Sequence, residues 1–165
     1  MILNHQEILH KIRRMAYQIY EANVDETQIV IAGIADNGFH LAELLKKEVE
    51  KITPLTVALC RVQMNKKSPI GQVSCDCALD AIENQSLVLV DDVLHSGTAL
   101  VYGVAFFLQV PLKQFKTAVL VDRNHKKYPV KADFKGISLS TSMNENVVVD
   151  FTPHNFSARM AYTYA

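Results

Sequence analysis

Residues 87–99 read LVLVDDVLHSGTA, and this stretch decides the fold of the chain. The four apolar residues Leu87–Val90 lack the polar alternation of a half-exposed strand, which indicates a strand buried on both faces of a parallel sheet. Two adjacent carboxylates follow, and a short turn then opens an apolar segment, 98–108, that Pro111 closes as a helix. Strand, acidic pair, turn and helix in this order are typical of an α/β protein.

The rest of the chain continues the alternation of strands and helices. Asn4 and Glu7 have the spacing of a capping box, before a helix that we expect to run to about Tyr20. Strands are predicted at 29–32, 55–60, 117–121 and 147–149, and a helix at 41–49. The pattern predicts one α/β domain over residues 1–165, with a central, mainly parallel sheet flanked by helices and joined by right-handed crossovers.

Charge and hydropathy exclude several classes of protein. Lys and Arg number 17 and Asp and Glu also number 17, so no global positive charge draws the chain to nucleic acid or to an anionic membrane. No stretch approaches the roughly 20 apolar residues of a membrane span, and the N-terminus lacks the regions of a signal peptide. We therefore expect a cytoplasmic protein with no membrane partner.

The cysteines are three in number: Cys60, Cys75 and Cys77. An odd count without a C-x-x-C pair predicts reduced thiols, with neither a disulfide framework nor a zinc site. We expect the run 75–77 to be structural.

Three predicted strands end in unusual loops: Gly33–Gly38, Asp91–Ala99 and Asp122–His125. Ligands of open α/β sheets bind outside the carboxyl ends of the strands, so these loops should open on one edge of the sheet.

The polar segment 61–71 is predicted to be an exposed, mobile loop. Surface lysines are common, so we interpret Lys66 and Lys67 as part of a solvated surface. Arg61 directly follows a predicted strand, and we expect it to be functional.

The turn after the acidic pair has the chemistry of a phosphate site. Ser96, Gly97 and Thr98 can place hydroxyl and backbone N–H donors around a phosphate at a helix N-terminus. Asp91 and Asp92 cannot bind that phosphate, but they suit the hydroxyls of a sugar or a hydrated Mg²⁺ ion. The alternative is structural, with acids that only end a strand and a hydroxyl that caps a helix. The glycine-rich patterns of dinucleotide-binding and P-loop proteins are absent from the sequence, which disfavours both classes.

Residues 89–99 resemble the phosphoribosyl-pyrophosphate (PRPP) signature of type I phosphoribosyltransferases: an apolar strand, two acids, two apolar residues and a small-residue turn. Residues 33–38, with Leu41 and Ala42, are similar to the pyrophosphate loop of that family. A second set of residues resembles the pyrimidine-operon attenuator, a bifunctional uracil phosphoribosyltransferase: 121–125, Pro129, 132–134, Gly136, Thr141 and Ser142. The resemblance implies the type I phosphoribosyltransferase fold, with a core of about residues 1–121 and a small hood subdomain of about 122–151.

The resemblance also implies a role for each loop. Asp91 and Asp92 would hold the ribose hydroxyls and the cofactor Mg²⁺, and would act in catalysis with His95 and Arg61, while the 61–71 loop closes over the site. The 5′-phosphate would be wrapped by His95, Ser96, Gly97, Thr98 and Ala99. Pyrophosphate would contact Ala35, Asp36, Asn37 and Gly38. The base would lie under the hood, beside Val121, Asp122, Arg123 and Phe134.

Three places in the sequence depart from the family's pattern. Asn37 stands where the pyrophosphate loop usually has Arg, and Asp36 places an acid before it, which predicts weaker or more metal-dependent binding of pyrophosphate. Thr98 and Ala99 replace an Arg-Thr pair and look like the Gly-Thr-Ala ending of orotate phosphoribosyltransferases. His95 stands where hypoxanthine-guanine relatives have Asp and the attenuator has Tyr, which predicts a change in base handling.

These residues are compatible with three functions. The favoured one is transfer of ribose 5-phosphate from PRPP to a nucleobase with release of pyrophosphate, uracil being favoured and hypoxanthine or guanine the alternative. The second is a nucleotide-sensing regulator that binds RNA, which zero net charge makes less favoured. The third binds PRPP or a nucleoside monophosphate without turnover. The resemblance also implies a homo-oligomer, a dimer or larger.

Overall fold

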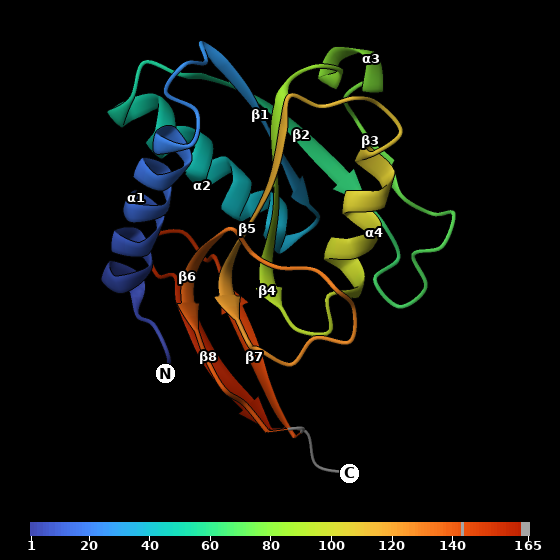
Figure 1. The fold of residues 1–165 in the computed structure, drawn as a ribbon. Coiled ribbons are helices and arrows are strands. Elements are labelled where there is room, and N and C mark those ends of the chain that lie inside the picture. The colour runs from blue at the N-terminus through green and yellow to red at the C-terminus, as the bar shows by residue number, and fades with distance from the viewer. Residues whose placement is uncertain (143, 163–165) are drawn as a thin grey trace.

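Residues 1–142 and 144–162 are described by a computed structural model (Figure 1). The helices are α1 (His5–Glu21), α2 (Asn37–Ile52), α3 (Leu79–Ile82) and α4 (Thr98–Phe107). The strands are β1 (Gln28–Ile34), β2 (Thr56–Gln63), β3 (Ser74–Cys75), β4 (Ser86–Leu94), β5 (Gln114–Asp122), β6 (Phe134–Ser138), β7 (Glu145–Asp150) and β8 (Ser157–Tyr162).

Six of the strands form one sheet in the order β3-β2-β1-β4-β5-β6. Neighbours in this sheet are parallel, except that β3 runs antiparallel to β2 at the edge. From β1 the chain moves to one edge of the sheet, and from β4 it moves to the other. The strand order therefore reverses between β1 and β4, which is where open α/β sheets bind ligands. The predicted fold class, a mainly parallel sheet flanked by helices, is confirmed.

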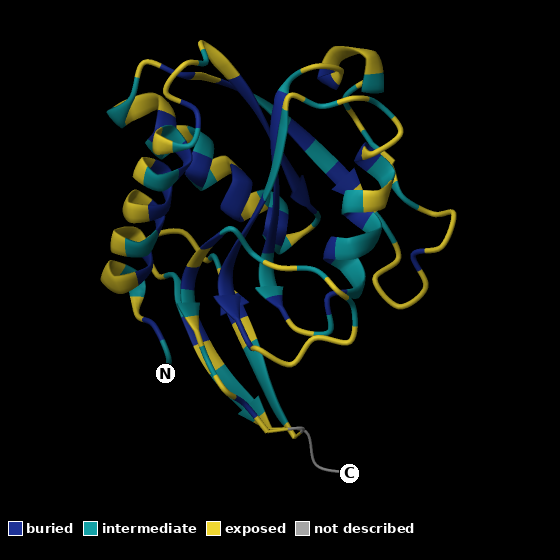
Figure 2. Ribbon diagram, in the orientation of Figure 1, coloured by how far each residue is buried: buried dark blue, intermediate teal, exposed yellow. Residues whose placement is uncertain are grey.

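Both faces of the central sheet are buried, as the dark strands of Figure 2 show. Along β1, Ile29 and Ile31 belong to the core under α1 and α2, whereas Val30 and Ala32 belong to the core under α4. The run Leu87–Val90 alternates between the same two cores in β4. A strand covered on both faces needs apolar residues at every position, and the run has them.

The first helix follows its sequence signals. The Asn4 side chain accepts a hydrogen bond of 2.9 Å from the Glu7 backbone N–H, and the Glu7 carboxylate accepts one of 3.1 Å in return. Asn4 is thus the N-cap, and α1 begins at the next residue, His5. The apolar face of α1 is buried. Over residues 1–142 and 144–162, the helices are too short or too polar to cross a membrane.

Two strands extend beyond their apolar runs. β4 continues through the acidic pair because it stays paired with β5 as far as Leu94 and Asp122. β2 continues to Gln63, so Arg61 lies within the strand instead of after it. Backbone pairing determines where a strand ends, so the end of an apolar run does not mark the end of the strand. The exposed segment of the predicted 61–71 loop therefore begins later, and we name residues 64–73 the 64–73 loop.

The C-terminal part contains more strand than the sequence indicated. β6 joins the central sheet beside β5, and the antiparallel pair β7 and β8 forms a hairpin. Leu3 bridges to Ala158, which ties the start of the chain to this hairpin. Short strands with mixed polarity carry little periodic signal, so β3, β6 and β8 were not predicted.

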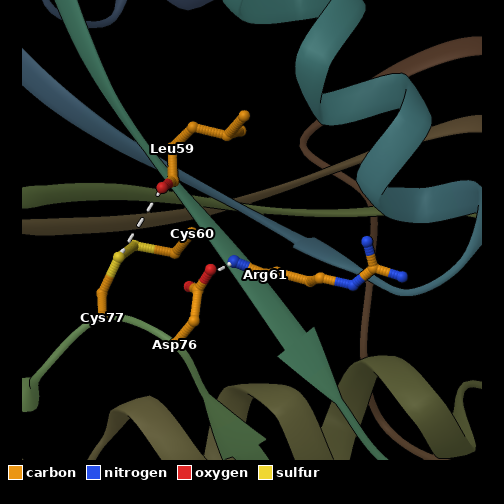
Figure 3. The surroundings of a disulfide bond; sticks show 5 residues. All are labelled: Leu59, Cys60, Arg61, Asp76 and Cys77. Atoms are coloured by element: carbon orange, nitrogen blue, oxygen red, sulfur yellow. Dashed lines mark hydrogen bonds between the residues drawn. A yellow bond between two sulfur atoms is a disulfide. The ribbon is translucent and has the colours of Figure 1, made fainter.

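The prediction of three reduced thiols is wrong. Cys60 and Cys77 form a disulfide with their Cα atoms 5.6 Å apart (Figure 3). Cys75 is free. The two partners lie on adjacent segments of the sheet edge but are 17 residues apart in sequence. A search for closely spaced cysteines does not detect such a pair.

Candidate active site

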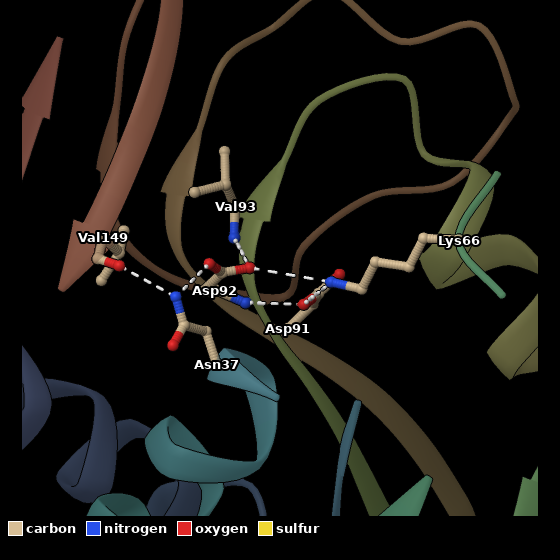
Figure 4. Close-up of polar contacts among 6 residues, drawn as sticks. All are labelled: Asn37, Lys66, Asp91, Asp92, Val93 and Val149. Carbon is tan, nitrogen blue, oxygen red and sulfur yellow. Dashed lines mark hydrogen bonds and ion pairs between the residues drawn. The ribbon is translucent and has the colours of Figure 1, made fainter. Parts of the chain in front are cut away.

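The acidic pair lies in β4 at the carboxyl edge of the sheet (Figure 4). Asp91 is buried, and its Oδ1 accepts hydrogen bonds from the Asp92 backbone N–H at 2.9 Å and from Lys66 Nζ at 3.0 Å. Lys66 Nζ also lies 4.0 Å from Asp92 Oδ1. The side chain of Lys66 is exposed, as expected of a solvated loop, but the 64–73 loop also brings its ammonium group onto both acids, which was not predicted.

Burial and charge change the protonation of this cluster. Burial, together with the negative charge of Asp92, raises the pKa of Asp91 to about 7. Burial opposes the charged form of Lys66, but the two acids outweigh it and raise the pKa of the lysine above its ordinary value. Lys66 therefore stays positive and compensates the ionised form of the pair.

The predicted phosphate turn lines a small cavity. The cavity has a volume of about 180 Å³, and its lining residues include Lys66, Asp91 and the whole turn from His95 to Ala99. This volume is below the few hundred Å³ of a typical ligand pocket, so it suits one part of a ligand, such as a phosphate group. The turn opens directly into α4, whose N-terminal end attracts an anion.

The sequence of the turn explains its shape. Gly97 has a φ of +88°, and a Cβ there would lie 2.7 Å from the Val130 side chain, so only glycine fits. The Ser96 and Thr98 hydroxyls hydrogen-bond each other at 2.8 Å. Partial burial, followed by the positive charge of Arg123, lowers the pKa of His95, which favours its neutral form.

The predicted pyrophosphate loop, residues 35–38, comprises the turn after β1 and the first two residues of α2. Its acid, Asp36, pairs with Arg61: Oδ1 lies 3.0 Å from Arg61 Nη2. The guanidinium group also lies 5.0 Å from the centre of the Phe39 ring. Among the described residues, Arg61 Nε is a buried donor without a hydrogen-bond partner. The structure thus brings the loop and Arg61 together. The Arg61 guanidinium group is already paired with an acid of the chain, Asp36.

Asn37, the residue in the position of the family's arginine, links three elements. Its Nδ2 donates to the Val149 carbonyl of β7 at 2.8 Å and to Asp92 Oδ2 at 3.3 Å (Figure 4). The next residue, Gly38, packs directly against β4: a Cβ at this position would lie 2.8 Å from the Val90 carbonyl oxygen. The loop is therefore seated against the acidic pair on one side and the β7–β8 hairpin on the other.

The four predicted base-binding residues are mainly buried. Val121 and Phe134 belong to the apolar core, and Asp122 is buried with Lys126 and Lys135 within 3.8 Å of its carboxylate. The side chain of Arg123 is buried as well, and it donates to Thr141 Oγ1 at 2.9 Å and to the Glu145 carbonyl. These contacts tie Arg123, which follows β5, to Thr141 and to Glu145 at the start of β7. Base binding at these positions stays a prediction.

The donor set of the acidic pair fits a magnesium ion. Mg²⁺ is usually held by one or two carboxylates together with substrate phosphates and waters. Asp91 and Asp92 offer carboxylate oxygens beside the phosphate-sized cavity, and a cationic group, the Lys66 ammonium, already lies against both acids. Asp91 and Asp92 would hold the ion, which would compete with Lys66 for the same oxygen atoms.

Comparison with known proteins identifies the class of protein that this fold and site define. A family model described as a phosphoribosyl transferase domain matches residues 1–154. The chain belongs to the phosphoribosyltransferase family.

Within that family, the chain belongs with the bifunctional PyrR proteins. It is 32% identical over 160 residues to the bifunctional protein PyrR of Bacillus subtilis, and the match covers 90% of this chain and 88% of the relative. It is 31% identical over 156 residues to the PyrR protein of Macrococcus caseolyticus, with 90% of each chain covered. The resemblance to the pyrimidine-operon attenuator branch is confirmed.

Solved structures confirm the fold. The hypoxanthine phosphoribosyltransferase of Trypanosoma cruzi has a TM-score of 0.75 at 17% identity, covering 90% of this chain and 84% of its own. A hypoxanthine-guanine phosphoribosyltransferase of Bacillus anthracis has a TM-score of 0.74 at 19% identity, covering 90% of this chain and 86% of its own. At these identities the likeness concerns the fold alone.

Proposed function

We propose that the chain transfers ribose 5-phosphate from PRPP to a nucleobase, uracil in preference to hypoxanthine or guanine, and releases pyrophosphate. The observation that carries this proposal is the position of the acidic pair beside the phosphate-sized cavity at the start of α4. One short stretch of chain thereby offers carboxylates for the sugar and donors for its phosphate. Relatives named bifunctional PyrR support the pyrimidine branch.

The reaction breaks the bond between the anomeric carbon of ribose and pyrophosphate, and a nitrogen of the base forms the new bond from the opposite face. No protein nucleophile is needed, so the chain acts by positioning and by electrostatics. The turn from Ser96 to Ala99 binds the 5′-phosphate, and Asp91 and Asp92 hold the ribose hydroxyls. Their ionised oxygens stabilise positive charge that develops on the sugar. Bound Mg²⁺ would neutralise pyrophosphate.

Closure of the 64–73 loop completes this proposal. Lys66 belongs to the loop, and it reaches the acidic pair at 3.0 Å from a side chain that is 42% exposed. When PRPP binds, the Lys66 ammonium group can exchange its ion pair with Asp91 for one with the pyrophosphate oxygens. A closed loop excludes water, which otherwise hydrolyses the activated sugar. We propose the cytoplasm as the site of action, since phosphorylated substrates of this charge do not cross membranes unaided.

The test is a measurement of pyrophosphate release. The protein is incubated with PRPP, Mg²⁺ and one of uracil, orotate, hypoxanthine, guanine, adenine or xanthine, with an Asp91→Asn, Asp92→Asn variant as control. Release with uracil that the control lacks supports the proposal, and release with a purine alone selects the alternative base. No release with any base, in protein that is stabilised against heat by a nucleoside monophosphate, contradicts turnover and supports nucleotide binding alone.

A second candidate function, RNA binding, is favoured by one surface. A groove of about 560 Å³ beside α1 and α2 is lined by one acid, Glu48, by several apolar residues, and by the basic and histidine side chains of His5, His10, Arg13, Lys47, Lys51 and His154. Such a cluster can contact phosphates even though the chain as a whole is neutral. The test is a gel-shift titration with a pyrimidine-gene leader RNA at several salt concentrations. Backbone binding must weaken steeply with salt, and a salt-independent shift contradicts it.

We also propose that the chain works as a homo-oligomer, at least a dimer, as its resemblance to the family implies. Light scattering after size exclusion measures the mass directly, and a mass of 18.5 kDa at micromolar concentration contradicts the proposal.

A further inference from the structure

The three cysteines lie together at the edge of the central sheet. Cys60 is fully buried in β2 and forms the disulfide with Cys77, which follows β3 (Figure 3). Cys75 is free, and its sulfur lies within 4.8 Å of both disulfide sulfurs. Three sulfurs within this distance form a cluster in which a disulfide can exchange partners.

The disulfide encloses the segment that carries the active-site cations. Arg61 directly follows Cys60, and Lys66 lies in the 64–73 loop, so both cations are inside the closed ring of chain. The far end of the loop is otherwise held by β3, which pairs with β2 at two positions only, and by Val73, which packs partly buried against the core under α4. Asp76 adds two contacts: its carboxylate accepts from the Arg61 N–H at 2.7 Å, and its own N–H donates to the Arg61 carbonyl at 3.1 Å.

So short a ladder at a sheet edge opens easily. The disulfide is therefore the covalent part of an otherwise weak attachment, and its loss should release the far end of the 64–73 loop.

We infer that Cys60 and Cys77 are the reactive couple of a thiol–disulfide exchange site, with small dithiols and small disulfides as reactants, which controls how firmly the 64–73 loop is held. In the reducing direction, the two thiols of a small dithiol break the Cys60–Cys77 bond. The dithiol loses two electrons and closes to a cyclic disulfide, and its two protons end on the two protein thiols. A small disulfide reverses the reaction.

The surroundings of the couple suit both states. The Leu59 carbonyl oxygen lies 3.6 Å from the Cys77 sulfur, so the thiol released by reduction has an acceptor in place. Burial, and after it the charge of Asp76, raises the pKa of the Cys75 thiol. Cys75 is therefore protonated at neutral pH and attacks the neighbouring disulfide slowly, which leaves opening to an external dithiol.

The exchange chemistry does not depend on the proposed function; only its effect on transfer does. The first test counts free thiols, without any activity assay. Protein is equilibrated with oxidised or reduced dithiothreitol, denatured, alkylated with N-ethylmaleimide and weighed by mass spectrometry. We expect one adduct, on Cys75, in the oxidised sample and three in the reduced sample. Three adducts in both overturn the inference, and so does a stoichiometric zinc ion that blocks the thiols until a chelator is added.

The second test asks whether the disulfide holds the loop. Trypsin cleavage after Lys66 and Lys67 is followed without reductant in Cys75→Ser, which keeps the couple, and in Cys75→Ser, Cys77→Ser, which lacks it. Cleavage should be about tenfold faster in the double variant, because proteolysis follows the population of the opened segment. Equal rates overturn the inference. If the double variant does not fold, wild-type protein reduced and then desalted under anaerobic conditions replaces it in the same comparison.

Discussion

The turn after β4 and the turn after β1 meet at the same edge of the sheet, but their polar groups are occupied differently. After β4, the Ser96 and Thr98 hydroxyls contact each other and their own turn, beside an open cavity. After β1, Asp36 is paired with Arg61, and the Asn37 amide is bonded to two other elements. The proposed phosphate side is therefore ready for an anion, whereas the proposed pyrophosphate side must first release partners of its own.

The largest effect should come from the acidic pair, which both sides share. Asp91→Asn with Asp92→Asn should lower the rate of pyrophosphate release by about 10³-fold, because the charge that stabilises the developing cation is lost. The measurement is kcat/KM for PRPP with the preferred base. The exposed acid Glu43 of α2 supplies the control, Glu43→Gln, which should retain the wild-type rate. A loss below tenfold in the double variant would mean that the pair does not act on the sugar.

The phosphate side should show the next effect. Ser96→Ala with Thr98→Val removes two hydroxyls from the cavity and should weaken binding of a nucleoside monophosphate by about 10- to 100-fold, as expected for hydrogen bonds to a charged group. Calorimetric titration measures the affinity. Thr27→Val, at the opposite end of β1, changes an exposed hydroxyl of the same type and should bind like wild type. Unchanged affinity in the double variant would place the phosphate elsewhere.

The buried acid predicts a pH effect on metal-free protein. The pKa of Asp91 is about 7 in the fold, above its ordinary value of 3.8, so the folded state keeps a proton that the unfolded chain loses. This contribution is fully present below pH 4 and is lost as the pH rises through 7, with a slope of at most ~1.4 kcal/mol per pH unit. Urea unfolding between pH 4 and 8, with chelator present, measures it. Asp91→Asn should flatten the profile, and a parallel profile would contradict the buried proton.

The smallest effect should come from the pyrophosphate side. Asp36→Asn frees Arg61, and affinity for pyrophosphate should rise by roughly threefold to tenfold, with a steeper salt dependence. Stability should change by less than ~1 kcal/mol, because Asp36 is 81% exposed and exposed pairs contribute little. Isothermal titration with Mg²⁺-pyrophosphate checks the affinity. Weaker binding in the variant would mean that Asp36 itself holds the metal-bound anion.

The sequence predicted what local signals encode. The capping box, the doubly buried strand and the turn into α4 each depend on residues close together in the chain, and each is present in the structure. The contacts that were not predicted join distant positions: Lys66 to Asp91, and Asn37 to Val149 across 112 residues. The Cys60–Cys77 bond is of the same kind. No periodicity reports such pairs, because they depend on how the strands are ordered in the sheet.

The Asn37 side chain has a consequence for how two substrates would bind. One amide group contacts Asp92 on the proposed sugar side and the β7 backbone on the hairpin side. A ligand that moves β7 must alter the hydrogen bond at Asp92, and a ligand that recruits Asp92 must alter the hold on β7. Thermodynamic linkage makes such an influence equal in both directions. The two substrates should therefore bind with heterotropic cooperativity, and replacing Asn37 by alanine should make their affinities independent of each other.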